Sequence, residues 1–373
     1  MFEEVLNPQS PFFWLLLISI LAAVFLFIGR YFRTYVKFVY PNAKFEAIGN
    51  PFIQEKELNI LVENTTLETF KDRLNTLRDY QVDGDNASLI QQSLDTNFLR
   101  TVAMMRKDSS KKLYAFFDLY LQKNDFPLIK NEIKTILLGM ERHPLVERAA
   151  HPQTKKLLEQ LQGVSKEQLS SVLAAQGFTK DLQDEVSKET PDFFQIDLLF
   201  EKAFLAQFKA LKVPYKCENA KEDFIKNMVD MLTIQHLLRA KQLSYPPDRG
   251  KSLFLGEGKQ ISRWRFDAMI DASDVPGLIT ALDGTSYFPL LSTKIEHYSK
   301  QKSVSMFETL IQSVFLLRVK QISLQNYLTI GPLLRFLVSK EFEIKNLKVI
   351  AKGIAENLPT ELIKSNLVKE VAA

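Results

Sequence analysis

The sequence predicts an all-α protein in which one transmembrane helix precedes three tandem helical domains with pseudo-threefold symmetry. Three observations lead to this prediction: a long uncharged apolar segment near the N-terminus, apolar residues at helical spacing through the rest of the chain, and a long internal repeat. The length of 373 residues is enough for two or three domains. Only 13 residues are glycine, which disfavours a fold rich in tight turns and favours long helices.

The N-terminal segment has the length and composition of a membrane-spanning helix. No charged side chain occurs from Val5 to Gly29, and Pro11–Ile28 is almost entirely apolar. At about 1.5 Å per residue this stretch is roughly 27 Å long, close to the thickness of a hydrocarbon core. Aromatic residues flank it, as they do at membrane interfaces: Phe12, Phe13, Trp14, Tyr31 and Phe32. We expect a membrane anchor over residues 1–40, with the transmembrane helix at about 11–29.

The charges around this segment predict its orientation. Arg30, Arg33 and Lys37 follow the apolar run, whereas Glu3 and Glu4 precede it. The positive-inside rule then places the bulk of the chain on the cytoplasmic side of the membrane. The alternatives are a cleaved signal peptide, which would carry its basic residues before the apolar run, and a buried core helix. The reversed charge order disfavours the first, and the uncharged length disfavours the second.

After Tyr40-Pro41 the sequence is soluble in composition and helical in period. Apolar residues recur at helical spacing in Lys111–Leu121, Phe307–Leu317 and Ile344–Ile354. Polar breaks separate such runs, and alternating strand patterns of useful length are absent from the sequence. Two four-residue segments match the capping box that starts a helix, one from Thr65 to Glu68 and one from Ser165 to Gln168.

An internal repeat predicts the domain organisation. Three similar segments surround Ile133, Ile234 and Ile344, and these isoleucines lie 101 and 110 residues apart. The period is too long for a tetratricopeptide or HEAT unit, so it indicates three copies of a small helical domain. We expect these domains over residues 41–145, 146–250 and 251–373.

No residue qualifies as a catalytic, cofactor-binding or metal-binding candidate. Gly250-Lys251-Ser252 resembles the end of a phosphate-binding loop, but Tyr245 stands where that loop needs its first glycine. Gly256-Glu257-Gly258-Lys259 lacks the spacing as well. Both segments are interpreted as turns.

The remaining polar residues also fit structural or solvated positions. The four histidines show no metal-ligand spacing: His143, His151, His236 and His297. Basic pairs such as Arg106-Lys107 and Lys111-Lys112 are typical of solvated helix faces, and a net charge of +4 does not demand a nucleic-acid partner. The single cysteine, Cys217, excludes an intrachain disulfide and fits a small core residue.

One C-terminal segment resembles the signature of a known family. Residues 336–353 read FLVSKEFEIKNLKVIAKG, and the turn Asn357-Leu358-Pro359 follows. This segment resembles the C subunit of archaeal and bacterial V/A-type ATPases, the relative of the d subunit of eukaryotic V-type ATPases. Further family motifs are matched by Tyr40–Lys44, Tyr120–Gly139 and Asp230–Lys241, so that the resemblance covers residues 40 to 373.

The resemblance implies a non-catalytic subunit in the central stalk of a rotary ATPase or ATP synthase. It implies a funnel of three helical domains that joins the membrane proteolipid ring (c or K type) to shaft subunits of the D and F type. In that position the protein transmits torque for coupled proton or sodium transport and uses no cofactor, nucleic acid or small-molecule substrate. Soluble members of the family do not show the N-terminal membrane segment.

Two other functions stay open at this point. The first is a single-pass, membrane-tethered helical scaffold that works outside a rotary ATPase, and it predicts purification without ring or catalytic subunits. The second is an enzyme with an unrecognised site, which would need a deep pocket with convergent ionisable groups.

We predict that the purified chain neither hydrolyses ATP nor binds it specifically, because the Gly250-Lys251-Ser252 segment lacks the rest of a phosphate-binding loop. Equilibrium dialysis with labelled ATP tests this, with Lys251→Ala as the matched variant. Saturable binding that disappears in Lys251→Ala would contradict the prediction.

Overall fold

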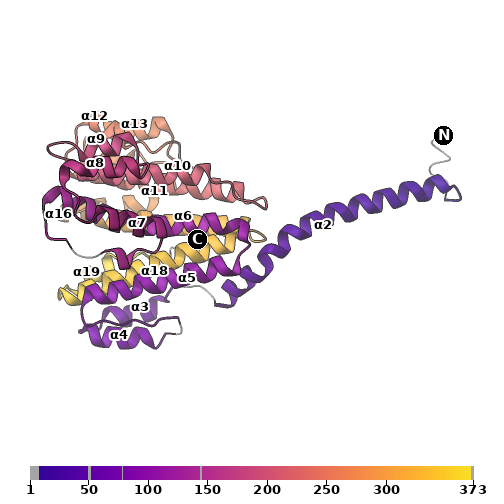
Figure 1. Ribbon diagram of the computed structural model, residues 1–373, viewed down its shortest axis with the longest axis horizontal. Helices are drawn as coiled ribbons and strands as arrows, with labels where there is room; N and C mark the ends of the chain where they lie inside the picture. The colour runs from indigo at the N-terminus through magenta and orange to yellow at the C-terminus, as the bar shows by residue number, and fades with distance from the viewer. Residues whose placement is uncertain (1–7, 49–51, 78, 143–144, 371–373) are drawn as a thin grey trace.

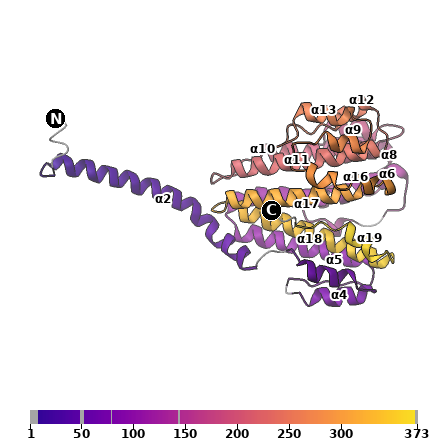
Figure 2. The ribbon, with the colours of Figure 1, turned by 180° about the vertical axis from the view of Figure 1, so that it is seen from behind.

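The computed structural model describes residues 8–48, 52–77, 79–142 and 145–370 (Figure 1). Throughout these ranges the regular structure is helical and no strand occurs, which confirms the predicted all-α class. The body of the molecule is a bundle of long and short helices, and one N-terminal helix extends away from it (Figures 1 and 2).

The extending helix, α2, runs without interruption over Pro11–Ile48. Within the described residues it is the one helix long and apolar enough to cross a membrane. Its apolar side chains face outwards, with Phe25 77% and Phe27 74% exposed, so this part of α2 is not a core helix of the body. The helix also continues through Pro41 and past residue 40, where the anchor was expected to end. Glu3 and Glu4, used to predict the orientation, lie outside the described residues.

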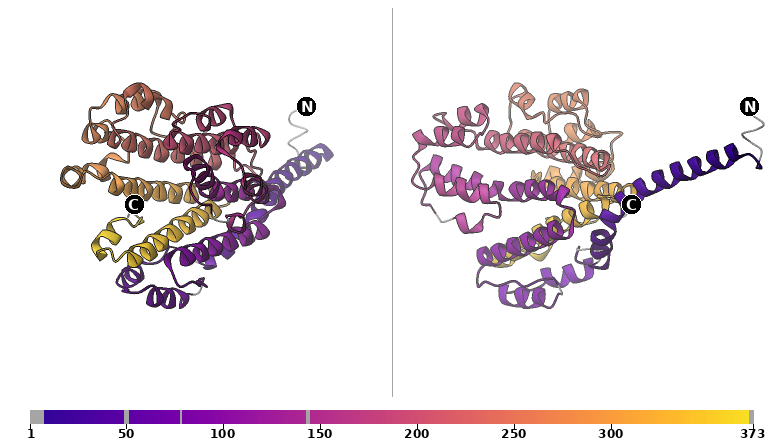
Figure 3. Two further views of the ribbon diagram at one scale, coloured as in Figure 1. Left: turned by 60° about the vertical axis from the view of Figure 1, so that its left-hand side comes forward. Right: turned by 45° about the vertical axis from the view of Figure 1, so that its right-hand side comes forward.

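Six long helices form three antiparallel hairpins that run side by side along the body (Figure 2). Each long helix packs against two others, in the order α5, α6, α10, α11, α17, α18 and back to α5, so the six close into a ring (Figure 3). The hairpins are α5 (Ala87–Asp108) with α6 (Tyr114–Leu138), α10 (Phe193–Ala210) with α11 (Glu218–Gln242), and α17 (Ser305–Gln325) with α18 (Gly331–Ala355).

Short helices precede each hairpin, and this order occurs three times along the chain. The first group is α3 (Glu55–Val62) and α4 (Leu67–Asn75), and the second is α7 (Pro152–Leu161), α8 (Lys166–Ala175) and α9 (Lys180–Val186). The third is α12 (Pro247–Gly250), α13 (Arg263–Asp271), α14 (Val275–Thr280), α15 (Phe288–Ser292) and α16 (Ile295–Gln301), and α19 (Thr360–Ser365) ends the chain. The division at residues 145 and 250 remains a prediction.

The sequence repeat maps to the second helix of each hairpin. Ile133, Ile234 and Ile344 are buried in α6, α11 and α18, respectively. Each lies three residues nearer the start of its helix than the one before it, whereas the three helices all have 25 residues. Three residues are nearly one helical turn. The repeated segments therefore present a similar side of each helix, but each lies about one turn nearer the start of its helix than the one before.

The second helices also end in the same way. Gly139, Ser244 and Asn357 follow them in the left-handed conformation, with φ of 62°, 56° and 53°. In each case the next residue donates its amide hydrogen to a carbonyl five residues back, as in a Schellman motif. This shared ending is stronger support for a structural repeat than the sequence spacing alone.

One of the two predicted capping boxes forms. Ser165 and Gln168 make both reciprocal hydrogen bonds at the start of α8, which confirms that prediction. The box from Thr65 to Glu68 is wrong, because α4 starts one residue later: Thr66 is the N-cap and accepts a hydrogen bond from the amide of Thr69 at 3.2 Å.

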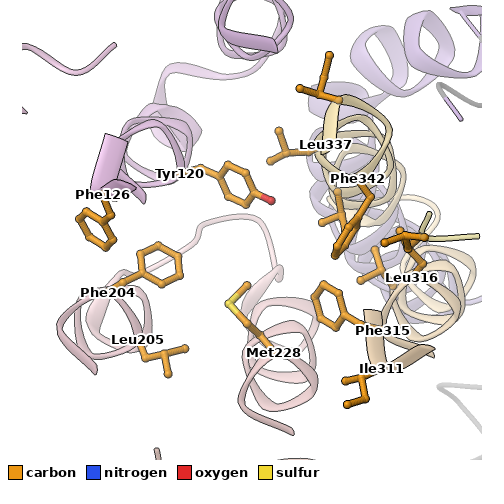
Figure 4. Packing of buried hydrophobic residues seen from close by; sticks show 14 of the residues in the cluster. Tyr120, Phe126, Phe204, Leu205, Met228, Ile311, Phe315, Leu316, Leu337 and Phe342 are labelled. Carbon is orange, nitrogen blue, oxygen red and sulfur yellow. The ribbon is translucent and has the colours of Figure 1, made fainter. Parts of the chain in front are cut away.

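A continuous apolar interior joins the hairpins. Buried residues from Phe38 in α2 to Val368 near the C-terminus belong to one packed cluster. Figure 4 shows Tyr120, Phe204 and Phe315, from three different hairpins, facing a common interior. Cys217 is fully buried with a free thiol, as expected for a core residue. Because close-packed interiors have low compressibility, this cluster makes the six-helix ring one stiff body.

A buried carboxylate fixes the segment that follows the second hairpin. Asp230 of α11 is fully buried and accepts hydrogen bonds from the amides of Lys259, Gln260 and Ile261 at 3.2, 2.9 and 2.9 Å. Burial raises the pKa of Asp230 to about 6, although these amide hydrogen bonds act in the opposite direction. The segment approaches so closely that a Cβ atom on Gly258 would lie 1.8 Å from Oδ1 of Asp230.

We predict that Gly258→Ala destabilises the fold by about 2–4 kcal/mol, because the methyl group would displace Asp230 from its amide donors. Urea unfolding of the detergent-solubilised chain measures this. Gly250→Ala is the control, since its Cβ would meet only Ile270 at an ordinary 3.7 Å. Equal stability of the two variants would contradict the role assigned to Asp230.

Candidate functional site

The three hairpin tips meet at the end of the body from which α2 emerges (Figure 1). We define the hairpin tips as residues 109–113, 211–217 and 326–330, which join the two helices of each hairpin. The first and second tips touch through the hydroxyls of Ser110 and Tyr215, 2.8 Å apart. Cys217 at the second tip lies against Thr329 and Ile330 of the third. Burial raises the pKa of its thiol to about 11, although hydrogen bonds with these two residues act in the opposite direction.

The base of α2 is attached to all three hairpins. The ring of Phe38 packs edge-on against Tyr215 of the second tip, with centroids 6.0 Å apart. Lys44 forms an ion pair with Asp108, the last residue of α5, at 2.5 Å. Phe45 packs on Phe336 of α18 with ring centroids 4.9 Å apart.

Asn42 makes the most directional of these contacts. Its amide nitrogen donates to the carbonyls of Tyr327 and Thr329 at the third tip, at 3.1 and 3.0 Å. One turn later the Tyr327 hydroxyl donates back to Glu46 at 2.8 Å. These polar contacts fix the rotation of α2 about its own axis, which apolar packing alone would leave less defined.

Several residues of the C-terminal signature are buried where α18 contacts other segments of the chain. Lys340 of α18 is 2% exposed, and its ammonium group lies 2.9 Å from Glu343 and 2.7 Å from the hydroxyl of Tyr80. The Tyr80 hydroxyl also donates to Glu343. Burial raises the pKa of the Glu343 carboxyl and raises that of Tyr80 well above its usual value. Removing Lys340 or Glu343 would leave an uncompensated buried charge, so the group holds α18 against the segment that precedes α5.

Two further signature residues join α18 to other parts of the chain. Glu341 pairs with Lys123 of α6 at 2.8 Å and accepts a hydrogen bond from Tyr120. Asn346 donates to the carbonyl of Val368 at 2.7 Å and accepts from the amide of the same residue at 2.8 Å. The signature therefore encodes connections between distant segments rather than a reactive centre.

Polar contacts bridge each of the six helix pairs in the ring. They are Arg106 with Asp118, Lys130 with Asp197, Glu201 with His236, Arg239 with Glu308, Gln312 with Lys345, and Asp95 with Lys348. Exposed ion pairs contribute little to stability, so the apolar interior provides most of it. The pairs instead add directional contacts at each helix boundary.

The described residues among those dismissed as catalytic candidates lie in exposed, helix-capping or buried positions. Lys251 is exposed beside Asp248 at 3.0 Å, and the Ser252 hydroxyl donates to the carbonyl of Arg249. His151 caps α7, and His236 is buried against Glu201 at 2.5 Å. His297 is exposed on α16, and His143 lies outside the described residues. In the described part of the chain, no group of three His, Cys, Asp or Glu side chains could hold a metal ion.

A basic hollow that the sequence did not reveal opens at the second hairpin tip. It has a volume of about 760 Å³ and is lined by Lys112, Lys209, Lys212, Lys221 and Glu218, together with Ala210, Val213 and Pro214. We call it the lysine hollow. Lys209, Lys212 and Lys221 belong to the second hairpin and Lys112 to the first, so no local sequence pattern brings all four together. Lys111 and Lys112, interpreted as a solvated helix face, are both exposed in a short 3-10 helix, and Lys112 also borders this hollow.

Comparison with known proteins gives consistent matches over most of the chain. Residues 41–366 match the model of the ATP synthase (C/AC39) subunit family. The chain is 27% identical to the C subunit of the A-type ATP synthase of Methanothermobacter thermautotrophicus, covering 88% of this chain and 87% of that protein. It is 26% identical to the A-type ATP synthase C subunits of Methanocaldococcus jannaschii (89% and 86% covered) and Pyrococcus horikoshii (92% and 93% covered).

We predict that Asn42→Leu loosens the base of α2, because the carbonyls of Tyr327 and Thr329 lose their side-chain donor. Local opening of residues 38–48 should become easier by about 1–3 kcal/mol, read as faster amide hydrogen exchange. Ala47→Leu, on the exposed side of the same helix, is the control. Unchanged exchange in Asn42→Leu would show that Asn42 does not hold α2.

Proposed function

Because the chain belongs to the ATP synthase (C/AC39) subunit family, we propose that it is a non-catalytic central-stalk subunit of a V/A-type rotary ATPase or ATP synthase. In this role it joins the membrane proteolipid ring to the central shaft and transmits torque between them. ATP turnover and ion transport take place in other subunits. The observation that carries this proposal is the family match over residues 41–366, together with the relatives that are C subunits of A-type ATP synthases.

The architecture suits a part that carries torque. A rotor component must resist bending and twisting, and it needs large surfaces more than perturbed side chains. The closed ring of six helices provides this stiffness, because its helices share one apolar interior and are bridged at every neighbouring pair. The signature residues serve the same end, since they tie the last hairpin to the first.

We further propose that α2 anchors the protein in the membrane and enters the lipid-filled centre of the proteolipid ring. A helix outside the ring would have to pass the stator on every rotation, whereas an axial helix turns with the rotor. The base of α2 contacts all three hairpins, which supports a position near the axis of the body rather than on its rim. The match to the family model begins at residue 41, after the apolar part of α2.

The long apolar helix α2 also supports a second candidate function, a membrane-tethered helical scaffold outside any rotary ATPase. A pull-down in mild detergent separates the two functions. Ring and shaft subunits should co-purify with the chain in the first case. Purification of the chain alone, from membranes that contain an assembled rotary ATPase, would favour the scaffold.

We predict that a photo-cross-linker at Ser19 captures ring subunits in the assembled complex. Ser19→Cys labels selectively, because Ser19 is exposed on α2 while the native Cys217 is fully buried. The control is a cross-linker at Ser187, exposed at the end of α9, which should capture no ring subunit. Capture of lipid or stator alone at Ser19 would rule out the axial position.

Deletion of residues 1–29 gives an independent check. The truncated protein should dissociate from the ring more readily at high salt, where charge contacts are screened. Retention equal to that of the full chain would contradict an anchoring role for α2.

A further inference from the structure

The lysine hollow carries an excess of positive charge that the protein itself does not neutralise. Glu218 is its single acidic lining residue, and its carboxylate is already engaged by Lys221 at 2.7 Å and by the amide of Val213 at 2.5 Å. The hydrogen bond with Lys221 lowers the pKa of Glu218, so this carboxylate stays charged at neutral pH. Among the described residues no carboxylate forms an ion pair with Lys112, Lys209 or Lys212.

Part of the wall of the hollow is held in place by a buried lysine. Lys221 is only 7% exposed, and its ammonium group donates to the carbonyls of Lys209 and Leu211, which shapes the turn between α10 and α11. Helix α11, of 25 residues, begins at Glu218, so the positive end of its dipole also points to this region. An open basic hollow of this kind suits a compact group with more than one negative charge, such as a phosphate ester.

The position of the hollow relative to α2 indicates where that group comes from. The ammonium group of Lys112 lies 5.9 Å from the ring centre of Tyr215, and the same ring packs against Phe38 at the base of α2. The apolar part of α2 ends at Gly29, and the nine residues from there to Phe38 span about 14 Å. The head-group layer is about 5–8 Å thick on each side, so Phe38 would lie roughly 6–9 Å beyond it, and a tilt of α2 would bring the hairpin tips nearer to the layer.

Basic side chains also line the way from the membrane to the hollow. Arg30, Arg33 and Lys37 are exposed on α2 between its apolar part and Phe38. Lysine side chains reach towards an interface with their charged ends, and basic clusters next to a membrane helix bind anionic lipids. We propose that the lysine hollow binds the phosphate head group of an anionic phospholipid from the leaflet that α2 enters. The proposal rests on the proposed function in one respect, namely that α2 lies in the membrane.

Lipid retention tests the proposal on the full chain. The chain is reconstituted in phosphatidylcholine vesicles that contain phosphatidylglycerol as the anionic lipid, extracted in mild detergent, and analysed for the lipids that remain bound. We expect phosphatidylglycerol to be enriched over its share in the vesicles, and the enrichment to fall at high salt. In the variant Lys112→Gln, Lys209→Gln, Lys212→Gln, retention should fall roughly fivefold for each lysine, from about 1 kcal/mol per basic residue near an anionic surface.

The matched control replaces three exposed lysines remote from the hairpin tips, Lys156→Gln, Lys180→Gln and Lys294→Gln, and should retain phosphatidylglycerol like the parent chain. Resistance of each chain to extraction at alkaline pH reports separately whether α2 is in the membrane. A parent chain that resists extraction but holds both lipids in the vesicle ratio would overturn the lipid site and leave the anchor intact. A parent chain that is extracted would refute the anchor itself. Loss of ring binding in the triple lysine variant, with phosphatidylglycerol retention unchanged, would assign the hollow to an acidic protein partner and overturn the proposal.

Discussion

The packing of α18 against α5 closes the ring, and the rest of the architecture depends on this contact between the ends of the chain. Five of the six neighbouring pairs in the ring join segments that follow one another in order, but this one brings residues near 340 back to residues near 95. Closure imposes an entropic cost that grows slowly with loop length, so it needs specific compensation. The buried group of Lys340, Glu343 and Tyr80 and the ion pair between Lys348 and Asp95 lie at this junction. Gly353 allows α19 to approach, because a Cβ there would lie 2.6 Å from Ile363.

A closed ring of hairpins has two different ends, and the chain uses one of them to seat α2. At this end the helices are joined by short tips, so the surface is small and its three parts lie within reach of one helix. The tight turn of the third tip requires Gly331, since a Cβ there would lie 2.6 Å from the carbonyl oxygen of Ser323. The same turn presents the carbonyls of Tyr327 and Thr329 to Asn42. The turn that joins α17 to α18 is therefore also a point of attachment of α2.

The structural features that depend on local sequence patterns could be predicted from the sequence alone. Helical spacing, the Ser165 capping box and the uncharged run before Gly29 each depend on residues close together in the chain, and the helices form where these patterns predicted them. Helix α2 continues through Tyr40-Pro41, although proline normally interrupts a helix. Here Phe38, Asn42 and Phe45 are buried on both sides of Pro41, and these tertiary contacts hold the helix through it. The lysine hollow could not be predicted, since Lys112 and Lys212 are a hundred residues apart and meet only when two hairpin tips do.

The attachment of α2 has consequences for how force would pass between membrane and body in the proposed role. A helix joined to one hairpin would load that hairpin alone and could tilt about the single contact. Because α2 contacts all three hairpins, a turning force on the body is shared among them before it reaches the membrane segment. Apolar contacts at Phe38 and Phe45 resist separation but not rotation, whereas the bonds of Asn42 and the ion pair of Lys44 with Asp108 are directional. The base of α2 therefore combines apolar contacts that resist separation with polar contacts that resist rotation. In the proposed role, the stiff six-helix ring would transmit the torque from there to the rest of the body.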